Sequence, residues 1–252
     1  MLPDKRSRMN RPHARAFDLP PPFRPVVLRE VGDAFAHACA NAGALGAGTL
    51  VLVGRFDLEE FAVVLEPDVP LACARLAFYA GMVALGEALA ALAPPEKPIA
   101  IAWPDAVYVD RGLIGGGRLG WPGCTSEHAT PDWLVFGAAI RTVSMSREEA
   151  GLHPLATALE DEGFADVGSG RLVEGFARHL MVTLDRWQEG EFAPIAAKYL
   201  AKLKTEGGAR LAIDAKGDLN IRRLGKPIEF RRLVPALETP SWLDPRTGGP
   251  RL

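Results

Sequence analysis

The residue types best suited to ligand binding lie close together within residues 99–121 of this 252-residue sequence. Gly115, Gly116 and Gly117 follow one another directly in a strand-like run. Consecutive glycines weaken a strand, so they are typical of a place where a ligand or another backbone comes close. The sequence therefore predicts a bare backbone shelf, which is its best indication of a binding site.

Two charged residues flank the glycines and could act on a ligand. Arg118 follows them directly, and a guanidinium can clamp a phosphate through two N–H groups. Alternatively, Arg118 is solvated or paired at the rim of a sheet. Asp105 precedes the glycines, and its carboxylate could accept a hydrogen bond from a ligand amide or hydroxyl, or could cap a turn.

Two strands joined by a tight turn must position these groups. Residues 107–109 and the run that starts at Leu113 are rich in β-forming types, and Asp110, Arg111 and Gly112 between them are turn residues. This pattern is typical of a β-hairpin. The three glycines therefore lie on the second strand of a predicted hairpin.

Strands and helices surround the hairpin. The longest apolar segment, residues 71–93, is interrupted by Arg75 and Glu87, and its large side chains recur at helical spacing. It is predicted to be a helix with a buried face rather than a membrane span. The other predicted strands are residues 25–29, 49–53 and 61–65, and the other predicted helices are residues 33–42 and 171–187.

Three parts of the chain differ in composition. Residues 1–24 are rich in arginine and proline and are predicted to be a disordered tail. Residues 25–206 hold the elements above, and residues 207–252 are predicted to form a small β-rich domain. The predicted strands of that domain are residues 210–213, 219–223 and 228–233.

The sequence resembles the catalytic domain of the biotin/lipoate protein ligases over about residues 25–205. The resemblance is carried by the order of the elements and by two runs, Ala102-Trp103-Pro104-Asp105-Ala106 and Asp110-Arg111-Gly112-Leu113-Ile114-Gly115. It implies an α+β fold, with a mixed sheet flanked by helices and a small C-terminal β appendage. It further implies a strand at residues 132–142 and helices at residues 155–163 and 192–200. It also implies chemistry in which ATP and biotin or lipoate give an acyl-adenylate, which then acylates a lysine of a carrier protein.

The resemblance also suggests roles for individual residues. Trp103 would form a pocket wall, Arg55 would contact phosphates, and Arg141 lies where the family has an asparagine near the pocket. Cys124 lies close to His128 in the sequence, and a thiolate beside a histidine can be activated. Lipoyl and octanoyl transferases of this superfamily use such a nucleophile, but the placement of Cys124 does not match their pattern well, and a free loop thiol is the favoured interpretation.

Three motifs of the family are altered in this sequence. Gly112 stands where the family has a lysine that stabilises developing negative charge. The loop rich in glycine and arginine is reduced to residues 54–60, and residues 30–33 replace a Ser-Thr-Asn turn. These changes make adenylate formation doubtful, unless Arg111 or Arg118 replaces the lysine.

Three hypotheses about function remain open. The first is a ligase or acyltransferase with remodelled catalytic groups. The second is a non-catalytic protein that binds a biotin-, lipoate- or octanoate-like group in a pocket floored by the hairpin and its glycines. The third is an interaction module that recognises a partner through the β appendage.

Composition limits the partners and the compartment. The net charge of −2 and the pI of about 6.2 give no general reason to expect nucleic acid or an anionic membrane. The three cysteines lack paired spacing, so neither disulfides nor a metal site is expected, and a reducing cytoplasm fits best. A small acyl ligand and a biotinyl or lipoyl carrier protein are the expected partners, and the oligomeric state stays open.

Overall fold

The computed structural model describes residues 17–29, 32–144, 155–168, 170–190, 192–204 and 208–252. Its centre is a seven-stranded sheet in the order β1-β2-β3-β7-β6-β5-β4, in which β1 and β2 are parallel and the remaining neighbours are antiparallel. These strands are β1 (Arg24–Leu28), β2 (Thr49–Gly54), β3 (Leu58–Leu65), β4 (Ile99–Ala102), β5 (Ala106–Val109), β6 (Gly112–Gly120) and β7 (Leu134–Arg141). The predicted mixed sheet is confirmed.

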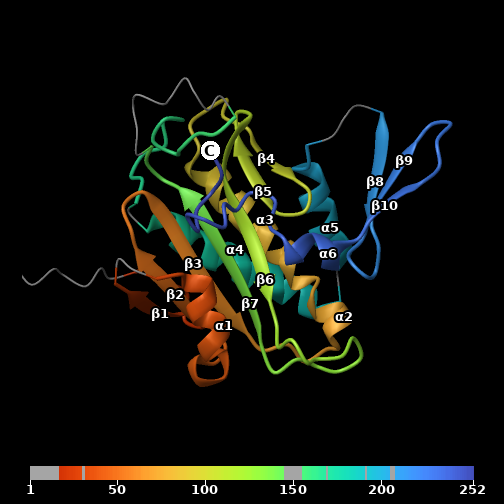
Figure 1. Cartoon of the computed structure of the whole chain (residues 1–252), viewed down its shortest axis with the longest axis horizontal. Coiled ribbons are helices and arrows are strands. Elements are labelled where there is room, and N and C mark those ends of the chain that lie inside the picture. Colours follow the sequence, from red (N-terminus) through yellow and green to blue (C-terminus); the bar gives the residue numbers. More distant parts are fainter. Residues whose placement is uncertain (1–16, 30–31, 145–154, 169, 191, 205–207) are drawn as a thin grey trace, which may run out of the picture.

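Helices cover both faces of this sheet. One face carries α1, and the other carries α3 and α4, as Figure 1 shows. A second sheet, in the order β10-β9-β8, is formed by the C-terminal part of the sequence. It lies on the right in Figure 1, beyond α5 and α6. The bounds of these elements are α1 (Ala34–Leu45), α2 (Leu71–Ala74), α3 (Ala77–Leu92), α4 (Arg171–Gln188), α5 (Phe192–Ala201), α6 (Leu233–Glu238), β8 (Ala209–Ile213), β9 (Leu219–Arg223) and β10 (Glu229–Arg231).

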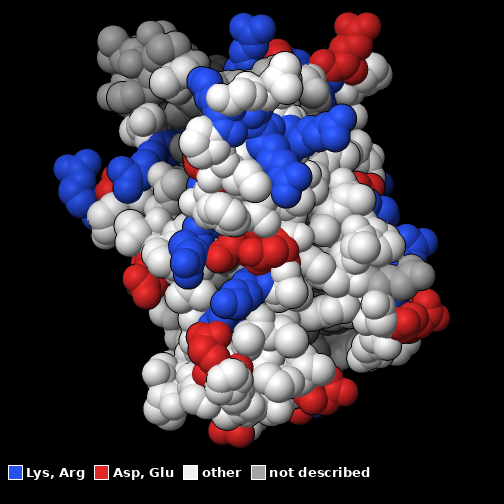
Figure 2. Space-filling view, turned by 90° about the vertical axis from the view of Figure 1, so that its right-hand side faces the viewer, with Lys and Arg blue, Asp and Glu red and all other residues white. Residues whose placement is uncertain are grey.

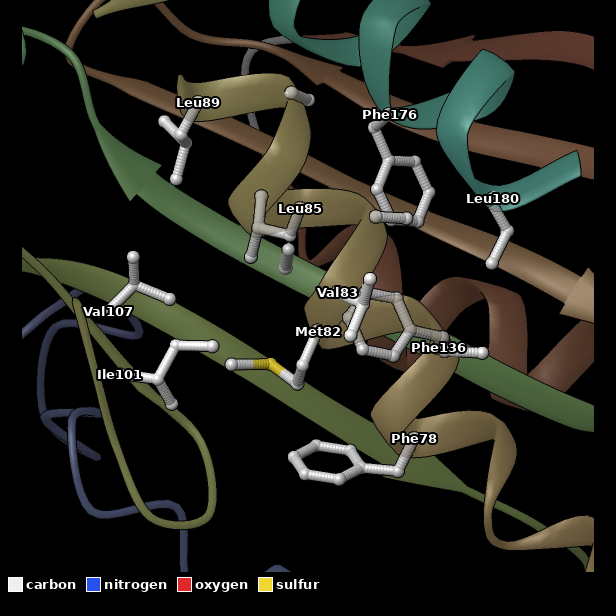
Figure 3. Packing of buried hydrophobic residues seen from close by; sticks show 14 of the residues in the cluster. Phe78, Met82, Val83, Leu85, Leu89, Ile101, Val107, Phe136, Phe176 and Leu180 are labelled. Carbon is white, nitrogen blue, oxygen red and sulfur yellow. The ribbon is translucent and has the colours of Figure 1, made fainter. Parts of the chain in front are cut away.

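The helix α3 is the centre of the hydrophobic core. Its side chains Phe78 and Met82 point toward the sheet, and Phe136 of β7 packs between α3 and Phe176 of α4 (Figure 3). The segment Leu71–Leu92 is long and apolar enough to cross a membrane, yet 78% of its most apolar window is buried inside the fold. Its hydrophobicity is therefore accounted for by burial in the core, as predicted.

The helix α1 begins where the sequence predicts it. The carboxylate of Asp33 accepts a hydrogen bond from the backbone N–H of Ala36 at 2.8 Å, which satisfies one of the free donors at the helix start. Ala34, Ala38 and Ala42 face the sheet, and their small side chains let the helix lie close to β2 and β3. This places the start of α1 over the middle of the sheet.

The predicted hairpin is β5 and β6. Asp110 and Arg111 have φ values of 41° and 76°, and Val109 pairs with Gly112, so a two-residue turn joins the strands. The register shifts within the hairpin near Gly115, whose φ is 150°. A Cβ there would lie 1.9 Å from the carbonyl oxygen of Ala139, so glycine is required at this position by the adjacent strand.

Several predicted boundaries are wrong. Residues 155–163 form turns rather than a helix, and the last predicted strand ends at Arg231 because α6 starts at Leu233. Residues 1–16 of the predicted tail lie outside the described residues, whereas residues 17–23 pack on the body, with Phe23 in the core.

The C-terminal β unit, whose division from the rest of the chain stays a prediction, packs against α3. Leu219 and Ile221 of β9 and Leu233 of α6 belong to the same hydrophobic cluster as α3. Tyr79 of α3 donates its hydroxyl hydrogen bond to the carbonyl of Gly217 at 2.5 Å. The unit therefore contributes side chains to the main core.

Candidate functional site

Residues 239–252, which we call the C-terminal strap, cross the same face of the sheet as α1. Figure 1 shows the strap running from α6 across β5 and β6. Side chains alternate along a strand, so Gly116 and Arg118 of β6 share one face. Arg118 contacts α1 and Gly116 contacts Trp242 of the strap, which places both on this face.

Trp242 anchors the strap in the sheet and is completely buried. Its ring packs with Leu58, Ala106, Leu113 and Ala139. Its Nε1 donates a hydrogen bond to the carbonyl oxygen of Gly117 at 3.1 Å. A Cβ on Gly116 would lie 2.1 Å from the carbonyl oxygen of Asp105 and 2.3 Å from the indole ring, so both the backbone at Asp105 and Trp242 require glycine at 116.

Asp105 holds the strap next to this tryptophan. Its carboxylate accepts hydrogen bonds from the backbone N–H of Ser241 at 2.9 Å and from the Ser241 hydroxyl at 2.6 Å. Its own carbonyl accepts a hydrogen bond from the N–H of Gly117 at 2.9 Å. Burial raises the pKa of Asp105 to about 6, although the Ser241 hydrogen bonds act in the opposite direction.

Arg141 binds the far end of the strap. Its Nη2 donates to the carbonyls of Pro250 at 2.6 Å and Arg251 at 3.2 Å, and burial lowers its pKa. Leu243 and Pro250 form an antiparallel bridge, and the N–H of Arg251 donates to the carbonyl of Trp242 at 2.7 Å. The strap is therefore a closed loop fixed at both ends.

Beside the strap, the start of α1 is filled by the chain's own charged groups. Glu60 is buried and accepts a hydrogen bond from the N–H of Ala34 at 2.7 Å, and its burial raises its pKa. Arg118 pairs with Asp33 at 2.8 Å and lies 3.9 Å from Glu60, with its guanidinium over the ring of Phe35. The charge of Arg118 is therefore balanced by carboxylates, which leaves no excess positive charge for an anion.

Arg55 is also paired within the chain. It donates to both carboxylate oxygens of Asp57, at 3.0 Å and 2.6 Å, and this hydrogen bonding raises the pKa of Arg55 and lowers that of Asp57. A cavity of about 270 Å³ lies next to Arg55 at the end of the β2–β3 hairpin, with walls that include Val27 and Leu52. Gly116 and Trp242 do not line that cavity.

The residues predicted to line the pocket lie on both faces of the sheet: Gly116 is on the α1 face, whereas Gly117 and Trp103 are on the α3 face. A Cβ on Gly117 would lie 2.6 Å from the sulfur of Met82 in α3, so Gly117 faces the core. Trp103 faces the same side, since its Nε1 donates to the hydroxyl of Tyr79 at 3.2 Å. The three glycines therefore do not all face one side of the sheet: Gly116 faces the strap, and ligand binding by these residues stays a prediction.

Two further positions concern catalysis. Cys124 is exposed in the loop after β6, and Gly120 at the end of that strand is already roughly 13 Å along the strand from Gly116. Gly112, at the position of the family lysine, is closely packed, because a Cβ there would lie 2.4 Å from the Cγ2 of Thr157. Neither residue places a nucleophile or a cation at Gly116. Among the described residues, no group of three or more His, Cys, Asp or Glu side chains could hold a metal ion.

The family model for the biotin/lipoate A/B protein ligase family matches residues 19–201. The chain belongs to this family. A biotin protein ligase-like protein of unknown function from Silicibacter sp. TM1040 is similar over 88% of this chain and 99% of its own, with 30% identity and a TM-score of 0.75. None of the curated proteins matches the chain.

Two structures of the biotin protein ligase from Aquifex aeolicus share the fold of this ligase-family chain. The apo structure has 18% identity and a TM-score of 0.63, and covers 83% of this chain and 99% of its own. The complex with biotin and ATP has 18% identity and a TM-score of 0.59, and also covers 83% of this chain and 99% of its own. At this identity the likeness concerns the fold.

Sequence reasoning missed the residues that close this site. Trp242 and Ser241 lie in a turn-rich terminal stretch, and Glu60 lies in the predicted short loop. A tryptophan in an otherwise polar, proline-rich terminus was the one available signal of a buried anchor. Its partner could not be identified from the sequence, because Trp242 meets Gly117 across 125 residues.

Proposed function

We propose that this ligase-family protein binds a biotin-, lipoate- or octanoate-like acyl group on the α1 face of its sheet without converting it to an adenylate. The observation that carries the proposal is the apolar space on this face that the side chain of Trp242 fills. It is lined by small and apolar residues, and the carbonyl of Gly117 accepts a hydrogen bond inside it. A biotin head group, which is bicyclic and carries N–H donors, suits such a hole better than a phosphate does.

The charged groups argue against a site for ATP. Arg55 and Arg118 are each paired with a carboxylate, Gly112 supplies no cation, and Glu60 takes the helix start where an anion would otherwise bind. The residues present therefore do not fit the triphosphate of ATP, and no step through ATP is derived. Binding of an acyl group needs none of these cations.

Family membership suggests the wider setting. A carrier protein with a biotinyl or lipoyl domain is the proposed macromolecular partner. The three cysteines are free, which agrees with the cytoplasm as the proposed compartment. Cys124 is exposed and lies beyond the end of β6, so an acyltransferase that uses this thiol is a less favoured alternative.

Thermal unfolding of the whole chain with biotin, lipoate, octanoate or biotinyl-5′-AMP tests the proposal. Ligand at a hundredfold excess over Kd should add about 2.7 kcal/mol of stability. The strap must leave before a ligand can bind, so the apparent affinity is reduced when only a small fraction of the molecules is open. Millimolar ligand is therefore required. If none of the four raises Tm, in the wild type or in a Trp242→Ala variant, acyl binding is wrong.

ATP–pyrophosphate exchange tests the second half of the proposal. We expect no exchange with any of the three acids. Exchange that is lost in Arg118→Met would show that the arginine replaces the family lysine, and the protein would then be a ligase. Arg111→Met tests the other arginine that could replace the lysine, and Arg222→Met, which changes an exposed residue of β9, is the matched control.

An interaction module is the second candidate, and one observation favours it. The small sheet leaves Phe230 62% exposed and Leu224 fully exposed. Residues 208–252 contain nine Lys and Arg against five Asp and Glu. Figure 2, which views the side of the molecule that faces right in Figure 1, shows a group of Lys and Arg side chains in its upper centre. Loss of binding to an acidic carrier domain in Phe230→Ser would support this candidate.

A further inference from the structure

We infer that the C-terminal strap is a releasable occupant of a ligand site: when it lifts, the space that Trp242 fills can take a ring of similar size with an N–H donor, such as a biotin-like head group, from another molecule. The inference rests on the proposed function, because the acyl group would enter the same hole. Beyond the proposed function, the inference specifies the kind of ring that the site would bind and identifies Trp242 as the group that competes with it.

The hole is deep because three neighbouring strands contribute only small residues to it. Gly116 of β6 is paired with Ala139 of β7 and with Ala106 of β5. At these three paired positions no side chain is larger than a methyl group. Leu58 and Leu113 form apolar sides, so the hole fits a ring of similar size to indole.

The hole also contains polar groups that a departing strap would leave without partners. The carbonyl of Gly117 accepts the Nε1–H of Trp242 at 3.1 Å. The carboxylate of Asp105 accepts both hydrogen bonds of Ser241. Buried acceptors without a donor are costly, so an incoming ring that carries an N–H is favoured over one without it.

The strap has the features of a segment that can open separately from the core. Trp242 is its one large fully buried side chain, and no helix or strand is assigned within it. Arg246, Arg251 and Leu252 are exposed. Segments with few buried contacts open at lower free energy than the strands they cover.

Chemical rescue tests the shape of the hole in the full chain. Trp242→Ala should lower Tm, and indole should restore part of the loss in a saturable manner. Indene, which has nearly the same shape without the N–H, should restore less. Trp187→Ala, which removes a partly buried indole between α4 and α5, is the matched control and should respond to neither compound. If indole has no effect on Trp242→Ala, the inference is overturned.

Hydrogen exchange of the wild type tests release of the strap without any variant that could misfold. The amides of Ser241 and Arg251 should exchange at least tenfold faster than the amide of Gly117, which is hydrogen-bonded within the sheet. Exchange of all three amides at one rate would mean that the strap opens only when the whole protein unfolds. That outcome also overturns the inference.

The two proposals can fail separately. If indole rescues Trp242→Ala and the strap amides exchange early, but no acid binds any variant, the strap inference stands and acyl binding fails. If an acid binds the wild type and Trp242→Ala with equal affinity, acyl binding stands and the strap does not compete for its site. Tighter binding of the acid by Trp242→Ala supports both.

Discussion

Asp105→Asn should change how the stability of the protein depends on pH. Burial raises the pKa of the Asp105 carboxyl from its ordinary value of 3.8 to about 6. Each pKa unit corresponds to about 1.4 kcal/mol, so keeping this carboxylate charged in the fold costs about 3 kcal/mol at pH 7. Asparagine has nearly the same shape and carries no charge, so it avoids that cost.

The direction of the effect follows from proton linkage. Between pH 4 and pH 6 the folded protein holds a proton on Asp105 that the unfolded chain has lost, so stability falls as the pH rises. Below pH 4 both states are protonated and the cost is absent. The free energy of unfolding of the wild type, relative to that of Asp105→Asn, should therefore fall by about 2.4 kcal/mol from pH 4 to pH 7, because about half of the unfolded chains have already lost the proton at pH 4.

Urea unfolding of both proteins at several pH values measures this difference. The contributions of the other titrating groups cancel, because these groups are the same in both proteins. Ser241→Ala is a useful second variant, because loss of its hydroxyl should raise the pKa of Asp105 further and move the transition to higher pH. A difference between the wild type and Asp105→Asn that stays constant from pH 4 to pH 7 would refute the reasoning. It would mean that the carboxylate is solvated and that the strap does not cover it.

Two more predictions concern packing and thiol reactivity. Gly112→Ala should lower the free energy of unfolding by about 1–3 kcal/mol, because its Cβ would lie 2.4 Å from Thr157, and a urea midpoint equal to that of the wild type would contradict this. With a chromogenic disulfide at pH 8, the exposed thiols of Cys73 and Cys124 should react quickly. Cys39 should react at least tenfold more slowly until urea is added, because burial raises the pKa of its thiol to about 11. Three equally fast native thiols would show that Cys39 is accessible.

The sequence by itself determined the frame of this protein. Local signals are sufficient for the turn at Asp110 and Arg111, for the start of α1 at Asp33 and for the apolar helix in the core. Each depends on residues within a few positions of one another, through turn preference, capping or helical periodicity. The resemblance to the ligase family follows the same local patterns, and the family model confirms it.

The tertiary structure alone decided what the candidate site contains. Ser241 meets Asp105 across 136 residues, and Arg118 meets Asp33 across 85 residues. The local sequence does not show that Arg55 and Arg118 pair with carboxylates of the chain or that Arg141 binds backbone carbonyls. Nor does it show that Gly117 faces the core. These outcomes depend on the strand register and on where a distant segment docks, because a shift of one residue along a strand exchanges its two faces.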